Sequence, residues 1–238
     1  MNSVFLENYR SIIQQPKLYI DYESNKAGKI YLVGFQYKDS FTQVITDPEL
    51  EGLATHLQLK VADPVDQTIQ LLNTAIRDNA AIVAYSEAEK QIFQNLLSDI
   101  DITQYQDLVY LNLLKATKSW INRHMKQAFD DLPPFRKNAS LYNQRPMQKS
   151  LASIMRLTSF NAPTDYAPLK TTTRLNTIGS ALVKKNQCYE TLTPIQKRKG
   201  TQALKHNEFD VKALPILFET IYSKDQSCFK KSLKRCFE

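Results

Sequence analysis

The fold of this chain is first indicated by the stretch LYIDYE at residues 18–23. Two more short segments, residues 29–36 and 41–45, are also rich in Tyr, Val, Ile and Phe, and polar breaks at residues 25–28 and 38–40 separate the three. Runs of β-branched and aromatic residues between polar breaks are typical of strands. The sequence therefore predicts an antiparallel meander of three strands.

Strands and helices alternate after this meander. Asp63 is suited to cap a helix, because its carboxylate can accept hydrogen bonds from the first free backbone N–H groups, and apolar residues recur on one face of the segment that follows. We then expect a strand at residues 80–85, a helix opening at Ser86, a strand at residues 107–111 and a helix at residues 113–128. This order predicts an α/β fold, a mixed sheet with helices packed on it.

The second half of the chain is expected to be less regular. Residues 130–186 are polar, basic and punctuated by prolines, so we expect a long insertion there with a short helix at residues 147–157. A last helix is expected at residues 193–222, followed by a basic tail at residues 224–238. Because 238 residues can bury one substantial core, we expect a single domain over residues 1–238.

Composition narrows the classes of protein. The chain has 31 Lys and Arg against 24 Asp and Glu, a net charge of +7, which favours polyanionic partners such as nucleic acid. Its three cysteines show no Cys-x-x-Cys spacing, which argues against a disulfide framework or a zinc ribbon and fits a reduced compartment. Since neither a secretion signal nor a long apolar segment is evident, we expect a cytoplasmic protein that does not bind membranes.

Two pairs of polar side chains stand out. Asp21 and Glu23 should project from one face of the first strand, with attachment points roughly 6 to 7 Å apart, and like charges facing one spot repel unless a cation lies between them. His206 and Asp210 are four residues apart and should share one face of the last helix. Both pairs favour a metal site, and a solvated polar face is the alternative for each.

These residues also carry a resemblance to a known family. Asp21-x-Glu23 is followed by the β-meander and, much later, by a helix with the pattern His/Tyr-x-x-x-Asp-Val-x-Ala, here His206 to Ala213. In order and spacing the motifs resemble the DEDD superfamily of ribonuclease H-like 3′-to-5′ exonucleases. The resemblance implies a ribonuclease H-like mixed sheet, in which the antiparallel meander is joined by parallel strands and flanked by helices.

More narrowly, the chain resembles a branch of predicted ribonuclease H-like nucleases often found beside RecB-type nuclease modules. The matching segments are YSEAE at residues 85–89 and KSL at residues 149–151, and the similarity spans about residues 18–222. It implies a divalent-metal-dependent nuclease that hydrolyses phosphodiester bonds of DNA or RNA as a 3′-to-5′ exonuclease. It also implies a protein partner such as a helicase or a RecB-type nuclease.

The resemblance further implies a two-metal site held by carboxylates. Carboxylate oxygens are hard ligands suited to Mg²⁺ or Mn²⁺, and two such ions can activate a water and stabilise the leaving oxygen of a phosphodiester. Asp21 would bridge the ions, and Glu23 and Asp210 would complete the shell with a fourth carboxylate. The family's usual second aspartate is absent from its place: Glu89 stands there instead, and Asp107 at the start of the next strand is the alternative.

The sequence also offers a second interpretation of Glu89 and an unusual spacing for His206. Ser86-x-x-Glu89 also matches a capping box, in which the glutamate closes onto the start of a helix. His206 is expected to orient or deprotonate the attacking water. Its spacing from Asp210 is typical of the tyrosine subgroup of the superfamily, whereas a histidine is typical of the other subgroup.

Basic and aromatic residues of the long insertion are candidates for binding the substrate. Positive charges neutralise phosphates and aromatic rings stack on unpaired bases, so this mixture favours single-stranded DNA or RNA, and solvated loop charges are the alternative. The candidates are Phe135, Arg136, Lys137, Tyr142, Arg145, Lys149, Lys170 and Arg174.

Other functions find little support. The five glycines form neither a dinucleotide-binding nor a P-loop motif, no Gly-x-Ser-x-Gly occurs, and His56 and His124 have no partner at ligand spacing in the sequence. The second hypothesis is a nucleic-acid-binding module, or a scaffold in a larger nuclease or defence complex, whose incomplete acidic set no longer catalyses. The sequence leaves open DNA against RNA and exonuclease against endonuclease.

Overall fold

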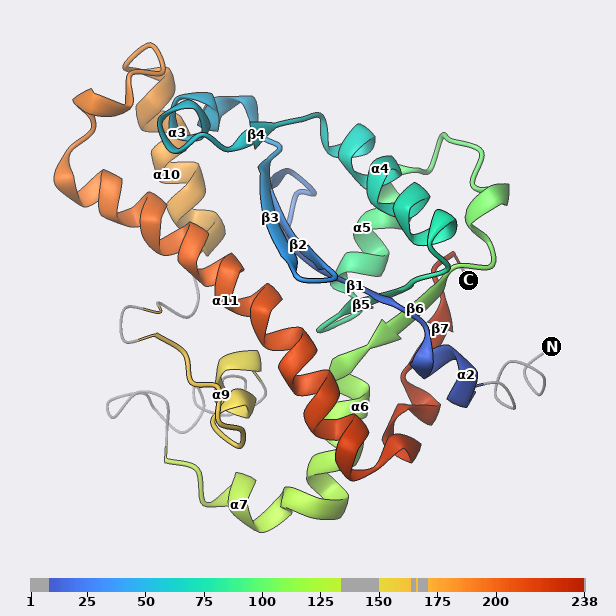
Figure 1. Cartoon of the computed structure of the whole chain (residues 1–238). Helices are drawn as coiled ribbons and strands as arrows, with labels where there is room; N and C mark the ends of the chain where they lie inside the picture. Colours follow the sequence, from blue (N-terminus) through green and yellow to red (C-terminus); the bar gives the residue numbers. More distant parts are fainter. Residues whose placement is uncertain (1–8, 134–149, 164–165, 167–170, 238) are drawn as a thin grey trace.

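The computed structural model describes residues 9–133, 150–163, 166 and 171–237 (Figure 1). Within them, seven strands form one mixed sheet in the order β4-β3-β2-β1-β5-β6-β7. β1, β2 and β3 pair antiparallel, and β5 and β6 run parallel to β1. The strands are β1 (Lys17–Ser24), β2 (Ile30–Tyr37), β3 (Ser40–Ile45), β4 (Lys60–Val61), β5 (Ala81–Ala84), β6 (Val109–Asn112) and β7 (Leu233–Arg235).

The predicted meander and the mixed α/β sheet of the ribonuclease H-like expectation are therefore confirmed. Side chains alternate along β1, so Leu18 and Ile20 are buried on one face while Asp21 and Glu23 lie on the other. β2 brings Gly34 opposite Asp21 on that second face. The acidic pair thus stands on the face of the sheet that is crossed by the last long helix.

Helices cover both faces of the sheet. α4 (Pro64–Arg77), capped by Asp63 as predicted, and α5 (Ala88–Leu96) lie on one face, and α6 (Leu113–Trp120), α9 (Leu151–Met155) and α11 (Pro194–Lys224) lie on the other (Figure 1). The remaining helical elements are α2 (Tyr9–Gln14), η1 (Pro48–Leu50), α3 (Glu51–Leu57), η2 (Thr103–Tyr105), the π-helix η3 (Ile121–Met125), α7 (Lys126–Asp130), α10 (Thr171–Val183), η4 (Tyr189–Thr191) and η5 (Gln226–Lys231).

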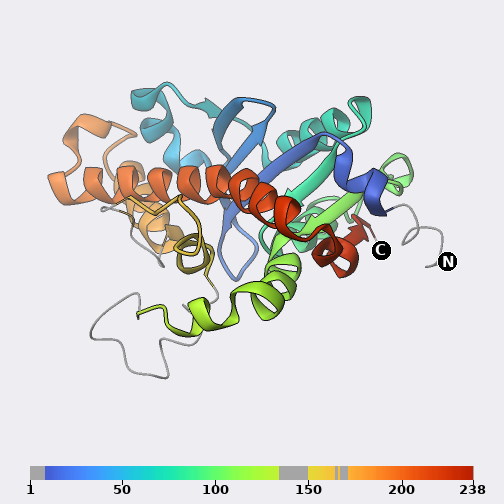
Figure 2. The same cartoon turned by 60° about the horizontal axis from the view of Figure 1, so that its bottom comes forward.

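α11 crosses the whole face of the sheet (Figure 2). It begins with a capping box, in which the Thr193 hydroxyl accepts a hydrogen bond from the Gln196 N–H and the Gln196 side chain accepts one from the Thr193 N–H. The helix then continues for 31 residues and carries buried Phe209, Val211 and Leu214 over the strands. Neither α11 nor any other helix in the described part of the chain is long and apolar enough to cross a membrane.

Some elements were not anticipated. α3, β4 and α10 were missed, and α10 lies inside the stretch that was expected to be irregular. Its start is rich in threonine, a poor helix former, but Leu175, Ile178 and Leu182 are fully buried against α11 and the meander, so tertiary packing stabilises the helix. β7 was also missed: part of the expected basic tail pairs with β6 as an edge strand.

Candidate metal and catalytic site

The acidic residues meet where β1 ends beneath α11. Asp21 and Glu23 point from β1 toward the helix, which presents His206 and Asp210 one turn apart. The Nε2 atom of His206 lies 3.2 Å from Oδ2 of Asp210 and 3.9 Å from Oε1 of Glu23. The side chains of Glu23, His206 and Asp210 keep 12, 13 and 18% of their exposure, so the group is largely enclosed but accessible to a small ion or water.

Glu89 joins this group from the opposite side of the sheet. It lies in the first turn of α5 and is buried, and Oε2 accepts hydrogen bonds from the Ser86 hydroxyl at 3.3 Å and the Tyr110 hydroxyl at 3.4 Å. The capping box expected from the sequence is not formed, because α5 is capped by Glu87 without a side-chain hydrogen bond and the Ser86 hydroxyl accepts from the N–H of Ala88. Because its charge raises the pKa of both Asp21 and Glu23, the residue belongs to the acidic group.

Like charges in this enclosed place shift the ionisation of the group. Burial raises the pKa of Asp21 well above its ordinary value, and the carboxylates of Glu23, Asp210 and Glu89 raise it further. Burial likewise raises the pKa of Glu23 to about 7, although the nearby His206 lowers it. Without a cation, the folded chain therefore favours protons on some of these carboxylates near neutral pH.

His206 has the opposite balance. Burial by itself lowers the pKa of the imidazole, but the charge and hydrogen bond of Asp210, together with the charge of Glu23, outweigh burial and raise the pKa above its usual value. Its Nδ1 atom is buried and has no hydrogen-bond partner among the described residues. The ring therefore interacts with the acidic group through Nε2.

Asn207 is a component that the sequence did not indicate. It is fully buried, and its Nδ2 atom donates to the backbone oxygen of Asp21 at 3.1 Å and to Oδ2 of Asp21 at 2.8 Å. Its Oδ1 accepts a hydrogen bond from Nε2 of Gln43 at 3.0 Å. The amide occupies the space above Gly34, so both β1 and the helix fix the carboxylate of Asp21.

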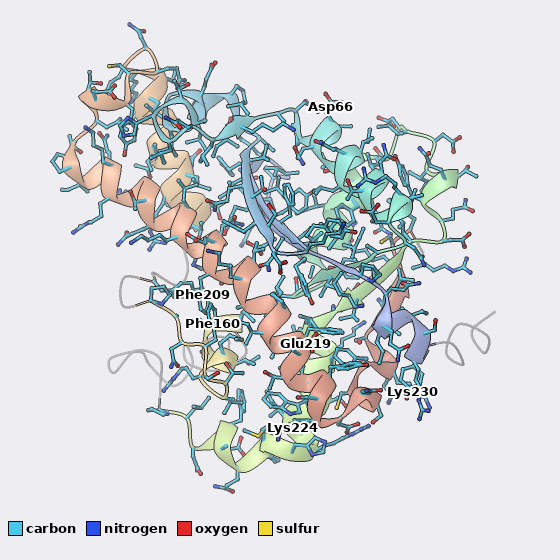
Figure 3. The ribbon with its side chains drawn as sticks, in the orientation of Figure 1. Asp66, Phe160, Phe209, Glu219, Lys224 and Lys230 are labelled. Atoms are coloured by element: carbon cyan, nitrogen blue, oxygen red, sulfur yellow. The ribbon has the colours of Figure 1, made fainter. Side chains whose placement is uncertain are left out.

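Tyr166 is a second component that was not foreseen. Its hydroxyl donates to Oδ1 of Asp210 at 3.1 Å, and its ring stacks on His206 with centroids 4.7 Å apart. Phe209 meets the edge of Tyr166 and stacks on Phe160 at 5.4 Å, and Figure 3 shows this phenylalanine pair beside α11. Asp210 is thus held by Tyr166 at one oxygen and His206 at the other.

Asp107 is not brought to this group. Its side chain is 95% exposed and lies 3.6 Å from Nη1 of Arg235. In the sheet register, Leu18 stands beside Ile82 and Ile82 beside Tyr110, so Asp107 and Asp21 lie toward opposite ends of parallel strands. That offset corresponds to about 20 Å at the usual rise per residue.

Of the candidate substrate contacts, Arg174 on α10 is described. Its charge lowers the pKa of both Glu23 and His206, so it lies near enough to act on the acidic group. The other candidates lie outside the described residues: Phe135, Arg136, Lys137, Tyr142, Arg145, Lys149 and Lys170.

The donor set fits a hard divalent cation. Asp21, Glu23, Glu89 and Asp210 offer carboxylate oxygens, the ligands preferred by Mg²⁺ and Mn²⁺, and the raised pKa of Asp21 marks a place where positive charge is stabilising. No three of these side chains bring their donor atoms within 4.8 Å of one another in the described structure. These carboxylates would therefore have to move closer together to hold one ion.

No protein-family model and no curated protein matches this chain. Among solved structures, the chain is similar to the crystal structure of the Aedes aegypti Nibbler EXO domain, at 12% sequence identity and a TM-score of 0.36, over 100% of this chain and 93% of that one.

Proposed function

We propose that this chain is a divalent-metal-dependent nuclease that hydrolyses phosphodiester bonds of DNA or RNA, acting as a 3′-to-5′ exonuclease. The observation that carries the proposal is the meeting of four carboxylates from β1, α5 and α11 at one enclosed place, where Asp21 acquires a strongly raised pKa. Such mutual repulsion destabilises a fold, and perturbed groups of this kind concentrate at functional sites.

Each side chain then has a distinct part. Two Mg²⁺ or Mn²⁺ ions, when bound, would activate a water and stabilise the leaving oxygen of the phosphodiester. Asp21, whose carboxylate accepts a hydrogen bond from Asn207, would hold the ions together with Glu23, Glu89 and Asp210. Neutral His206 would orient the attacking water or accept its proton.

The net charge of +7 and the position of Arg174 support a polyanionic substrate. The charge of Arg174 acts on Glu23 and His206, and a guanidinium is a group that recognises phosphates well. Single-stranded DNA or RNA is the preferred substrate in this proposal, since the basic and aromatic residues of the insertion suit unpaired bases.

A second candidate is a nucleic-acid-binding module without catalysis, which acts as a scaffold in a larger nuclease or defence complex. One observation favours it: Glu89, in place of an aspartate, already accepts hydrogen bonds from Ser86 and Tyr110. A carboxylate engaged in this way is less free to bind metal. This candidate predicts substrate binding with no metal-dependent cleavage.

End-labelled single- and double-stranded DNA and RNA, each incubated with the purified chain in Mg²⁺, Mn²⁺ or EDTA, test the two candidates. The nuclease proposal expects cleavage that EDTA abolishes and that Asp21→Asn and Asp210→Asn each reduce by roughly 10³-fold or more, the scale on which loss of a central group acts. Asp66→Asn, on the exposed face of α4 far from α11 (Figure 3), is the matched control and keeps full activity. Binding without cleavage in every metal would favour the scaffold, and equal cleavage by all variants would refute the site.

A further inference from the structure

A second group of metal-binding side chains lies at the far end of α11. His124 comes from the π-helix η3, Asp225 directly follows α11, and Cys228 lies in η5. Among the described residues, these three form a group of ligand atoms that all lie within 4.8 Å of one another. His124 is exposed, Asp225 is partly buried and Cys228 is buried, so the group opens to solvent on one side.

Local structure directs the three side chains to one point. Asp225 caps η5: its Oδ1 accepts hydrogen bonds from the Ser227 N–H at 3.0 Å and the Ser227 hydroxyl at 2.6 Å, which turns Oδ2 toward His124. The Nε2 atom of His124 lies 2.9 Å from that Oδ2. π-Turns in helices often mark functional positions, and here the turn presents His124 to the end of α11.

We infer that His124, Asp225 and Cys228 bind one Zn²⁺ ion, with a water as the fourth ligand. Tetrahedral Zn²⁺ takes imidazole, carboxylate and thiolate donors at about 2.0 to 2.3 Å, which places donor atoms roughly 3 to 4 Å apart. The observed convergence within 4.8 Å is compatible with that geometry. A thiolate and an imidazole also select Zn²⁺ over the hard Mg²⁺ and Mn²⁺.

This site is separate from the carboxylate group. Asp225 directly follows the end of α11 and comes 15 residues after Asp210. At the usual rise of a helix, this separates the two residues by about 20 Å. The ion would join η3, which continues α6, to the segment that follows α11, and Ile121 and Cys228 of these two elements already share one hydrophobic core. Its effect is therefore on stability, and it does not depend on the proposed nuclease function.

Arg123 defines the competing interpretation. Its Nη1 donates to Oδ2 of Asp225 at 3.0 Å and to the Ser227 hydroxyl at 2.6 Å, so the carboxylate is engaged without a metal. In the zinc-bound form His124 exchanges its hydrogen bond to Asp225 for the ion, while Arg123 keeps Ser227. A network of hydrogen bonds alone predicts that no zinc is retained.

The chain contains a matched control. His56 lies 3.1 Å from Oε1 of Glu190, and Sγ of Cys188 lies 3.7 Å from Oε2 of the same residue. This second trio offers the same donor types, but its ligand atoms do not all converge within 4.8 Å. Changes to His56 and Cys188 therefore test the effect of removing a histidine or a thiol at a place where no zinc site is inferred.

The test is zinc retention by the purified full chain after EDTA treatment, readdition of Zn²⁺ and competition with a chromogenic chelator. The parent is expected to retain one Zn²⁺ per chain. His124→Ala and Cys228→Ser should each weaken zinc binding by roughly 100-fold. Loss of a residue that only hydrogen-bonds to a metal ligand can already weaken binding by that much. His56→Ala, Cys188→Ser and Asp21→Asn should retain zinc as the parent does.

Two further measurements make the result decisive. Co²⁺ in place of Zn²⁺ should give a sulfur-to-cobalt charge-transfer band that Cys228→Ser lacks. Zn²⁺ should raise the melting temperature of the parent but not that of His124→Ala. Because His124 is exposed, its replacement should not unfold the protein, so a missing response to zinc would reflect the loss of a ligand. Absence of zinc retention by the parent, or retention that both His124→Ala and Cys228→Ser leave intact, would overturn the inference.

Discussion

Glu23 and His206 show how single residues set the ionisation of the carboxylate group. They lie 3.9 Å apart, between a strand and a helix, and neither has free access to bulk water. Burial raises the pKa of Glu23 to about 7, and the acidic neighbours of His206 raise its pKa despite burial. Their protonation states therefore change in the range where enzymes work, and each change has a measurable consequence.

Glu23→Gln is expected to stabilise the metal-free protein at neutral and alkaline pH. A carboxyl whose pKa is about 7 in the folded state and about 4.5 in the unfolded chain binds more protons when folded, so stability falls as pH rises through that window. The variant should be more stable than the parent at pH 8, by an amount on the order of 3 kcal/mol at most, and nearly equal to it at pH 4. Urea unfolding in EDTA at the two pH values measures the difference.

Glu208→Gln is the control for this comparison, because Glu208 is only partly buried on the same helix and pairs with Lys212. Its stability should follow that of the parent across the range. If Glu23→Gln lost stability at pH 8, Glu23 would be a structural residue and its charge would not be a source of strain.

His206 should govern the pH dependence of cleavage. An imidazole accepts a proton only when it is neutral, and its pKa is raised above about 6.5, so the rate should rise with pH through a midpoint above that value. His206→Ala should lose roughly 10² to 10⁴ in the single-turnover rate. A His206→Ala protein within a few fold of the parent, with the same pH profile, would assign the rise to metal-bound water and deny His206 a role as base.

The contact between β2 and α11 sets the geometry at the scale of elements. Asp21, Gly34 and Gln43 stand in one row across β1, β2 and β3, and Asn207 lies in the gap that the glycine leaves. A Cβ at position 34 would meet Oδ1 of Asn207 and come within 2.8 Å of its Cγ and 2.9 Å of Cγ2 of Val211. Gly34 is therefore required for the helix to approach the sheet closely enough for Asn207 to hold Asp21.

Gly34→Ala is expected to destabilise the fold by roughly 2 kcal/mol or more, because a buried contact this close forces the helix outward. Asn207→Ala removes most of the obstruction, so the double variant should lose less than the sum of the single variants. Urea unfolding of the four proteins measures this coupling. Gly28→Ala, where no atom lies within 4 Å and φ is +85°, should lose about 1 kcal/mol from backbone conformation alone and show no coupling with Asn207→Ala. Additive losses at positions 34 and 207 would contradict the close approach.

When the fold is considered as a whole, the residues of the proposed site lie at one end of the parallel strands. Glu89 follows the carboxyl end of β5, beside the end of β1. Asp107 precedes β6 and so lies at the opposite end of these parallel strands. This placement favours Glu89 over Asp107 as the fourth carboxylate of the proposed site. Of these two residues, it is Glu89 whose charge raises the pKa of Asp21.

Glu89→Gln is accordingly expected to reduce metal-dependent cleavage by roughly 10²-fold or more, while Asp107→Asn leaves it unchanged. Glutamine keeps an acceptor for Ser86 and Tyr110, so the melting temperature should move little in either variant and the loss would not reflect unfolding. Steady-state cleavage of a labelled single strand measures both. A larger loss of cleavage in Asp107→Asn than in Glu89→Gln would place the metal ligand at the opposite end of the strands and exclude the proposed site.

Local patterns in the amino-acid sequence predict several features of this protein. The alternation of residues 18–23 places Asp21 and Glu23 on one face, and the capping residues Asp63 and Thr193 mark where two helices begin. These features could be predicted because they depend on neighbours within a few residues. α10 could not, because its helix depends on burial against distant elements.

Contacts between residues that are distant in the sequence depend on how the whole chain folds. Asn207 reaches Asp21 across 186 residues of sequence, Tyr166 reaches Asp210, and His124 reaches Asp225 across 101 residues. No spacing rule connects such pairs, since their contact depends on how α11 crosses the sheet and where the chain returns. His124 and Cys228 were therefore ordinary residues in the sequence, and the path of the chain after α11 makes them neighbours.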